Sequence, residues 1–307
     1  MRARRGPRVP PAIVRAGVRQ LGRRCLDPGL PWDVQRTRLD QLTRALPPPR
    51  GTALMAQDVG GLRAEVVSSR DTDPRVTVVH FHGNGYCVGS ARTARSWAAH
   101  LSAHAGCRVV LPEYRLAPEH PYPAALDDAR AVITALSEAA DPGLLVVSGD
   151  SAGGGLALAA LVRMRDEDLR LPAGCVLLSP WLDLATNRSA LTRLVQRDVM
   201  LSPGWLDACA RAYADQAAWD DPLVSPLRAG HQGLPPLLIQ AGTDELLAPD
   251  AELLAGSARA AGVQVTYTRW PRMWHDFALE PGLLAAADSA LAQTAWFIAT
   301  VTKQAAG

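Results

Sequence analysis

The residues best suited to chemistry are a serine and its flanking glycines at positions 149–153, which read Gly-Asp-Ser-Ala-Gly. The apolar run 144–147 leads directly into them, and a helix-prone segment, 154–161, follows. In a Gly-x-Ser-x-Gly turn between a strand and a helix, strained backbone exposes the serine Oγ, and the glycines leave room for the turn. The spacing therefore predicts that Ser151 is a nucleophile and that the N–H of Ala152 faces the oxyanion. An ordinary glycine-rich turn with an incidental serine is the alternative.

A serine hydroxyl needs a base to accept its proton, and chain order limits the choice of histidine. Where such a turn carries the nucleophile, the acid and then the base follow it, each on a loop after a strand. Five of the seven histidines precede Ser151, and His231 lies ahead of the predicted strand 236–240. His275 comes after the predicted strand 263–269. The order therefore favours His275 as the base.

Four carboxyl groups compete for the role of orienting that base. Asp244 comes directly after a predicted strand, and the carboxyl ends of strands are where open α/β sheets place their sites. Asp250 is expected in the first turn of the next helix, where a negative charge is favoured. Asp276 is the direct neighbour of the base, and adjacent side chains usually diverge. We therefore expect Asp244 to be the acid, while its neighbour Glu245 stays open as a rival.

A third requirement is a set of N–H donors for the oxyanion, and the loop 82–86 can supply them. It reads His-Gly-Asn-Gly-Tyr and follows the predicted strand 76–81. A glycine-rich loop at a strand end exposes backbone N–H groups, and a His-Gly-Gly-Gly loop does this in lipases and esterases. Here Asn84 replaces the middle glycine. Asparagine tolerates left-handed backbone better than most residues and keeps its N–H, so the loop can hold the same shape.

Strand-like and helix-like segments alternate along most of the chain, which predicts a mostly parallel sheet covered by helices on both faces. Residues 182–232 interrupt this alternation with turn signals and no convincing strand, so they are expected to be an insertion. The predicted strands are 63–68, 76–81, 108–111, 144–148, 175–178, 236–240 and 263–269. The predicted helices are 11–25, 32–46, 91–105, 124–139, 154–161, 249–261 and 283–301.

The composition argues against several classes of function. A net charge of +2 over 307 residues gives no electrostatic reason to expect nucleic acid as a partner. No apolar run approaches the length of a membrane span, so stable membrane insertion is not expected. The cysteines are odd in number and contain no Cys-x-x-Cys pair, which predicts buried thiols in the cytoplasm and no metal site. The oligomeric state stays open, and a homo-oligomer is compatible with the sequence. The five cysteines are Cys25, Cys87, Cys107, Cys175 and Cys209.

With these residues in hand, the chain resembles the hormone-sensitive-lipase-like branch of the α/β-hydrolases, which includes carboxylesterases and arylacetamide deacetylases. The resemblance covers roughly residues 76–300. Besides the motifs above, it includes the segments 114–119, 121–125, 179–183, 221–226 and 234–236.

The resemblance implies an α/β-hydrolase fold with a helical cap and no cofactor or metal. It implies a triad of Ser151, Asp244 and His275, with oxyanion donors from Asn84, Gly85 and Ala152. It divides the chain into a catalytic domain, 51–182 and 226–307, and a cap made of an N-terminal helical segment, 1–50, and an insertion, 183–225. Two residues depart from the family pattern: Asn84 stands in place of a glycine, and so does Asp276.

The predicted function is that of a serine carboxylesterase, which hydrolyses small or short-acyl esters through an acyl-enzyme intermediate. One alternative changes the bond to an arylamide or formamide, as in an amidase or deacetylase. The other is a ligand-binding receptor, because plant hormone receptors use this scaffold without the catalytic histidine. The presence of His275 argues against a receptor.

Overall fold

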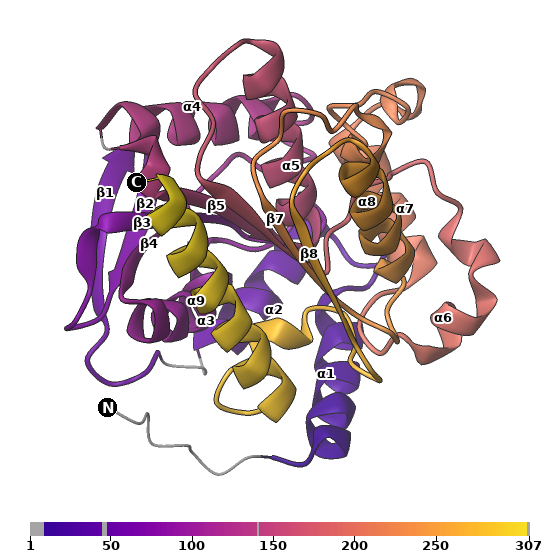
Figure 1. Ribbon diagram of the computed structural model, residues 1–307. Coiled ribbons are helices and arrows are strands. Elements are labelled where there is room, and N and C mark those ends of the chain that lie inside the picture. Colours follow the sequence, from indigo (N-terminus) through magenta and orange to yellow (C-terminus); the bar gives the residue numbers. More distant parts are fainter. Residues whose placement is uncertain (1–8, 45–47, 140, 306–307) are drawn as a thin grey trace.

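The computed structural model describes residues 9–44, 48–139 and 141–305, and a twisted sheet of eight strands runs through its centre (Figure 1). The strand order is β1-β2-β4-β3-β5-β6-β7-β8. β2 is antiparallel to both of its neighbours, and the remaining neighbours are parallel. The strands are β1 (Ala53–Val59), β2 (Leu62–Ser68), β3 (Asp73–Phe81), β4 (Cys107–Pro112), β5 (Leu145–Asp150), β6 (Gly174–Leu178), β7 (Leu237–Gly242) and β8 (Val265–Trp270).

Helices cover both faces of the sheet, α3 and α9 on one face and α4, α5 and α8 on the other (Figure 1). The alternation of side chains along each strand builds one apolar core on each face. Val78, Val146, Val176 and Leu238 pack toward α3 and α9, while Val79, Val147, Leu177 and Ile239 pack toward α4, α5 and α8. The helices are α1 (Pro11–Cys25), α2 (Trp32–Arg44), α3 (Ala91–Ala105), α4 (Ala124–Ala139), α5 (Ser151–Asp166), α6 (Thr192–Arg197), α7 (Pro203–Tyr213), α8 (Ala248–Ala260) and α9 (Ala285–Ala305).

The predicted mostly parallel sheet, covered by helices on both faces, and all seven predicted strands are confirmed, with small shifts at the strand ends. The end of the helix predicted at 32–46 lies outside the described residues. Strand β1 was not predicted, because it lies at the edge of the sheet and six of its seven residues are exposed, so apolar alternation is absent. The sequence signal that could have revealed β1 is the dipeptide Gly60-Gly61, which is typical of a two-residue hairpin turn. In the structure both glycines join β1 to β2 with left-handed φ angles of 59° and 81°.

The N-terminal helices lie against the segment that interrupts the strand and helix alternation. Trp205 of α7 donates its indole N–H to Oε1 of Gln35 in α2 at 2.9 Å, and Gly22 of α1 packs on Met200. Two segments that are distant in sequence therefore form one layer of contacts.

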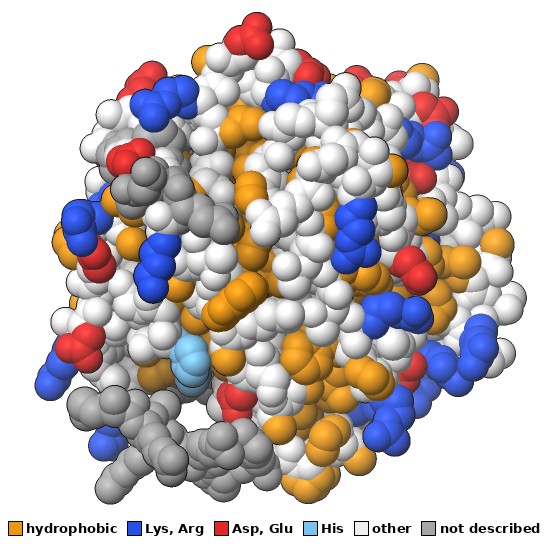
Figure 2. Space-filling view, viewed as in Figure 1, with side chains coloured by type: hydrophobic (Ala, Val, Ile, Leu, Met, Phe, Trp, Pro, Cys, Tyr) orange, Lys and Arg blue, Asp and Glu red, His pale blue; other side chains and the backbone are white. Residues whose placement is uncertain are grey.

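The surface carries charges of both signs. Figure 2 shows acidic and basic side chains interspersed along the upper and left edges of one face, with basic side chains gathered at the lower right. In the part of the chain that the structure describes, no helix is both long and apolar enough to cross a membrane.

Candidate active site

Ser151 stands at the sharp junction between β5 and α5. Its φ of 51° is left-handed, which is strained for a residue other than glycine, and this is the backbone expected where a nucleophile is held out from the end of a strand. Its carbonyl accepts the N–H of Trp181 at 2.8 Å, which fixes the turn against the loop after β6. Ala152 is the second residue of α5, where a backbone N–H has no acceptor within the helix. The elbow therefore has the shape that the motif predicts.

The loop after β3 lies directly against this elbow. A Cβ added at Gly83 would lie 2.8 Å from Cβ of Ser151, so only glycine allows this approach. Asn84 and Gly85 have left-handed φ angles of 71° and 66°. The tolerance of asparagine for this backbone accounts for the departure from glycine at position 84. The loop is thus held within reach of the serine.

Two residues that the sequence analysis missed hold the loop in place. One carboxylate oxygen of Asp150 accepts the N–H of Gly83 at 3.0 Å, and the other lies 2.9 Å from Nε2 of His80. Nδ1 of His80 lies 3.0 Å from Oγ of Ser148. The only sequence signal was the acidic residue inside the Gly-x-Ser-x-Gly motif, one position before the serine. Asp150 therefore joins β3, β5 and the donor loop.

The predicted base lies beside the predicted nucleophile. His275 follows β8, its ring is buried, and its Nε2 is 3.0 Å from Oγ of Ser151. This distance suits direct proton transfer from the hydroxyl to the imidazole.

The structure does not bring the predicted acid, Asp244, to the base. Oδ2 of Asp244 accepts a hydrogen bond from Arg15 at 3.1 Å, and Oδ1 lies 3.5 Å from Arg197. Its rival Glu245 is fully buried and places Oε2 3.7 Å from Nδ1 of His275. Successive residues of this turn face opposite sides, so one meets the arginines and the other meets the base. Of the two carboxyl groups, that of Glu245 therefore lies beside the imidazole of His275, and that of Asp244 does not.

A serine hydroxyl connects the acid turn with the base turn. Oγ of Ser179, at the end of β6, donates to Oε2 of Glu245 at 2.8 Å and accepts the N–H of Asp276 at 3.2 Å. Ser179 belongs to a segment on which the family resemblance was based, but nothing in its sequence showed this role. It orients the carboxylate that faces the base.

The expectation that Asp276 diverges from the base is wrong. Its Oδ2 lies 3.1 Å from Nε2 of His275, the same nitrogen that faces Ser151. The backbone of Asp276 has a left-handed φ of 58°, which turns the side chain back toward the preceding ring. The base therefore has a carboxyl group at each ring nitrogen.

Burial and these carboxyl groups act against each other on the imidazole. Burial by itself lowers the pKa of His275, but Asp276 and Glu245 outweigh it and hold that pKa well above its usual value. Burial raises the pKa of Glu245, although the neighbouring imidazole opposes this shift. The arrangement thus stabilises an imidazolium, the form that His275 takes when Ser151 gives up its proton.

Two cavities in the described parts differ in their relation to this site. One, of about 320 Å³, lies between α7 and the loop after β6, and Trp181, Leu184, Leu206 and Trp219 are among its lining residues. Ser151 and His275 are not among its lining residues, and its link to the elbow is Trp181, whose N–H bonds to the carbonyl of Ser151.

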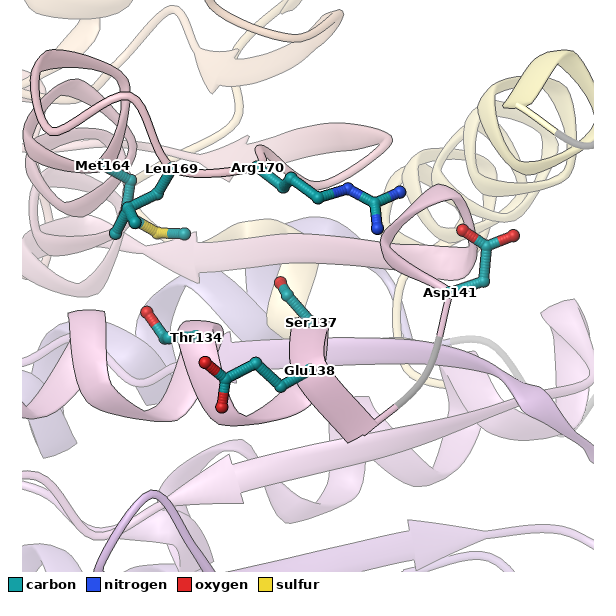
Figure 3. A pocket seen from close by; sticks show the side chains of 7 residues that line it. All are labelled: Thr134, Ser137, Glu138, Asp141, Met164, Leu169 and Arg170. Atoms are coloured by element: carbon teal, nitrogen blue, oxygen red, sulfur yellow. The ribbon is translucent and has the colours of Figure 1, made fainter.

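The other cavity, of about 600 Å³, is shown in Figure 3. It is lined by Thr134 and Ser137 of α4, Met164 of α5, and Leu169 and Arg170 before β6, among others. These residues lead into the amino-terminal ends of β5 and β6, whereas Ser151 and His275 follow carboxyl ends. This second cavity therefore lies at the opposite end of the sheet. Within the described ranges, no group of His, Cys, Asp and Glu side chains has the arrangement of a metal site.

A serine elbow, a buried histidine within 3.0 Å of it and a donor loop, each at the carboxyl end of its own parallel strand, define the class of α/β-hydrolases with a serine nucleophile. A family model described as the alpha/beta hydrolase fold matches residues 78–279. The acetyl-hydrolase of Streptomyces hygroscopicus is 41% identical over 218 residues, which are 71% of this chain and 73% of that protein. An esterase of Acinetobacter venetianus is 34% identical and spans 85% of this chain and 87% of its own length.

Solved structures give the same result. An esterase from the bacterial hormone-sensitive lipase family superposes with a TM-score of 0.89 at 34% identity, and the match covers 96% of this chain and all of that one. The chain belongs to the hormone-sensitive-lipase-like family of α/β-hydrolases.

Proposed function

We propose that this chain is a serine carboxylesterase in which Ser151 is the nucleophile, His275 the general base and acid, and Glu245 the carboxylate that orients the base. The 3.0 Å contact between Oγ of Ser151 and Nε2 of His275 is the observation that carries the proposal. The esterases and acetyl-hydrolases among its relatives support ester bonds as the target. The same contact argues against a receptor, which needs no activated serine.

The mechanism has two acyl-transfer steps. His275 takes the hydroxyl proton as Ser151 attacks the ester carbonyl, and backbone N–H groups of Asn84, Gly85 and Ala152 bind the oxyanion. The imidazolium then protonates the leaving alcohol. Water, activated by the same imidazole, releases the acid from the acyl-enzyme. No step requires a cofactor.

Small or short-acyl esters are the proposed substrates, and the cap is proposed to select them. The cap would consist of residues 1–50 and 183–225 over a catalytic domain of 51–182 and 226–307; residues 1–8 and 45–47 lie outside the described residues. The contact of Trp205 with Gln35 supports this division because it joins the two cap segments.

We also propose the cytoplasm as the location, because all five cysteines are free and buried. A reducing compartment keeps such thiols unpaired. The oligomeric state is left to measurement.

The test is hydrolysis of p-nitrophenyl esters of increasing acyl length by wild-type protein and Ser151→Ala. The substitution is expected to lower kcat by at least about 10⁴-fold, since the serine, histidine and acid act as a unit. Ser289→Ala, an exposed serine on α9, serves as the matched control and is expected to keep wild-type rates. Circular dichroism checks the fold of both variants. Turnover by Ser151→Ala within tenfold of wild type refutes the nucleophile.

A paired assay decides between the two kinds of bond. An acetyl ester and the amide with the same acyl and aryl groups are compared at equal concentration. We expect the ester to react faster by orders of magnitude. Equal kcat/KM values would favour the amidase or deacetylase.

A further inference from the structure

One carboxyl group in the site has no part in the mechanism above. Asp276 is more than nine-tenths buried, and its Oδ2 lies 3.1 Å from Nε2 of His275. Oγ of Ser151 lies 3.0 Å from that same nitrogen. The second oxygen of Asp276, Oδ1, is buried and has no hydrogen-bond partner among the described residues. The hydroxyl and the carboxyl group therefore compete for one nitrogen.

The backbone holds Asp276 in this position. Its φ of 58° and ψ of 20° lie in the left-handed region, and its N–H donates to Oγ of Ser179. Ser179 is itself bonded to Glu245, so the position of Asp276 is tied to that of the acid. The contact with His275 is thus part of a connected network.

A carboxylate 3.1 Å from the lone pair of a neutral imidazole nitrogen is repelled by it, so the contact requires a proton between the two atoms. That proton lies on Nε2 or on Oδ2. Burial raises the pKa of Asp276 to about 7, against the opposing effect of protonated His275. The two groups therefore titrate as a pair, and in both protonated arrangements Nε2 is closed to the Ser151 proton.

We propose that Asp276 is a positioning residue that holds a proton at Nε2 of His275 in the resting esterase and thereby sets the pH above which the imidazole can act on Ser151. This inference rests on the proposed roles of Ser151 and His275. The two carboxyl groups then act at different stages. Glu245 supports the base during the reaction, whereas Asp276 prevents the reaction from starting until the shared proton has left to solvent.

The other carboxyl groups around the pair act in the same direction, since a nearby negative charge favours the protonated form of either group. Glu280 interacts electrostatically with Asp276. Glu245 faces Nδ1 of the ring, and Asp150 acts on Asp276 from the end of β5. Asp198 also acts on the imidazole, and its carboxylate accepts three backbone N–H groups, from Met200, Leu201 and Leu246. Among these acids, Asp276 alone contacts the nitrogen that must accept the serine proton.

The sign of the effect follows from the form that reacts. Only unprotonated Nε2 accepts the serine proton, and a carboxylate beside it stabilises the protonated form. Activity is therefore lost as pH falls through the raised pKa of His275 and recovers above it. Removal of the charge at position 276 shifts this acidic limb of the pH–rate profile to lower pH.

The test compares the pH dependence of kcat/KM for wild type, Asp276→Asn and Asp276→Gly with a p-nitrophenyl ester. Both replacements suit left-handed backbone, so the turn is expected to survive. We expect the acidic limb to move down by about one pH unit or more in both variants, as an opposite charge within 4–6 Å of an ionisable group does. At a pH on the wild-type limb, the variants should then be about tenfold more active relative to their own plateau.

Glu252→Gln is the matched control. It removes an exposed carboxyl group on α8 that lies 3.8 Å from Arg269. Its limb is expected to stay at the wild-type pH. An unmoved limb in both Asp276 variants, or an equal shift in Glu252→Gln, overturns the inference.

NMR titration of the His275 ring in the Ser151→Ala background gives a readout without activity. Addition of Asp276→Asn is expected to lower the pKa of that ring by about one unit or more. No change overturns the proposal for Asp276 even if ester hydrolysis is normal. If wild-type protein hydrolyses no ester but the pKa of the His275 ring still falls in the Asp276→Asn variant, the proposed function is rejected. The pairing of Asp276 and His275 then still holds.

Discussion

The acid turn after β7 and the base turn after β8 each carry two adjacent ionisable residues, but they orient them differently. In the acid turn, Asp244 faces Arg15 and Arg197, while Glu245 is buried against the base. In the base turn, Asp276 folds back onto the ring of His275. The left-handed backbone of Asp276 causes this convergence. The comparison teaches that neighbours in sequence share a site only where the backbone conformation turns them to the same side.

The two turns also differ in what their carboxyl groups do to one imidazole. Both stabilise its protonated form, because opposite charges interact strongly where water is excluded. Glu245 approaches Nδ1, while Asp276 approaches Nε2, the nitrogen that also faces Ser151. In the proposed mechanism, the same chemical group therefore assists at one nitrogen and competes at the other.

The largest loss of activity is expected when the acid turn loses its buried carboxylate. Glu245→Gln is expected to lower kcat by roughly 10²- to 10⁴-fold, since the base loses the charge that fixes its tautomer and stabilises the imidazolium. The measurement is steady-state hydrolysis of a p-nitrophenyl ester at the pH optimum.

Asp244→Asn is the matched control for this substitution, one residue away in the same turn. It is expected to keep kcat within about threefold of wild type, because Asp244 contacts arginines and does not contact the base. The reverse order, with Asp244→Asn the slower enzyme, would return the acid role to Asp244.

A smaller effect is expected where the acid turn meets the N-terminal helix. Arg15 of α1 donates to Oδ2 of Asp244, to the carbonyl of Arg272 at 3.1 Å and to that of Arg197 at 2.6 Å. Arg15→Ala removes these bonds and is expected to lower the free energy of unfolding by about 1–2 kcal/mol, since the pair is partly exposed.

Chemical denaturation measures this loss. Arg15→Lys serves as the control: it keeps the charge but cannot reproduce the forked contacts, so an intermediate stability is expected. Stability of Arg15→Ala equal to wild type would show that these contacts do not hold α1 to the acid turn.

The smallest effect is expected in the loop after β3, where another residue has left-handed backbone. Asn84 has a left-handed φ of 71°, as Asp276 has one of 58°. Asn84→Gly is expected to keep kcat/KM within about threefold, because glycine accepts this conformation and keeps the N–H donor. Ester hydrolysis and thermal unfolding are measured together. A hundredfold loss in a folded variant would show that the asparagine side chain acts on the substrate.

Much of the fold could be predicted because the apolar pattern of each segment matches the strand or helix that the segment forms. The buried parallel strands are apolar on both faces, so their continuous apolar runs mark them. The neighbourhood of Ser151 and His275 could be predicted from the order of strands along the chain, since parallel strands bring their carboxyl ends to one edge. Strand β1 escaped because an exposed edge strand needs no apolar pattern.

The acid could not be chosen from the sequence for a different reason. Asp244 and Glu245 share the same position after β7, and nothing local states which of them faces the base. The partners of the two side chains lie far away in the chain: Asp244 meets Arg15, 229 residues away, and Glu245 meets Ser179 after β6. Ser179, Asp150 and His80 were missed in the same way, since each acts through partners on other strands.

The sequence by itself predicted seven of the eight strands, the serine elbow and the class of chemistry, because periodicity and glycine placement are local properties of the chain. Only the tertiary structure placed Glu245 at Nδ1 of the imidazole and Asp276 at Nε2. These positions depend on the direction of side chains over distances of a few ångströms, and that direction results from backbone conformation and from partners far apart in the chain.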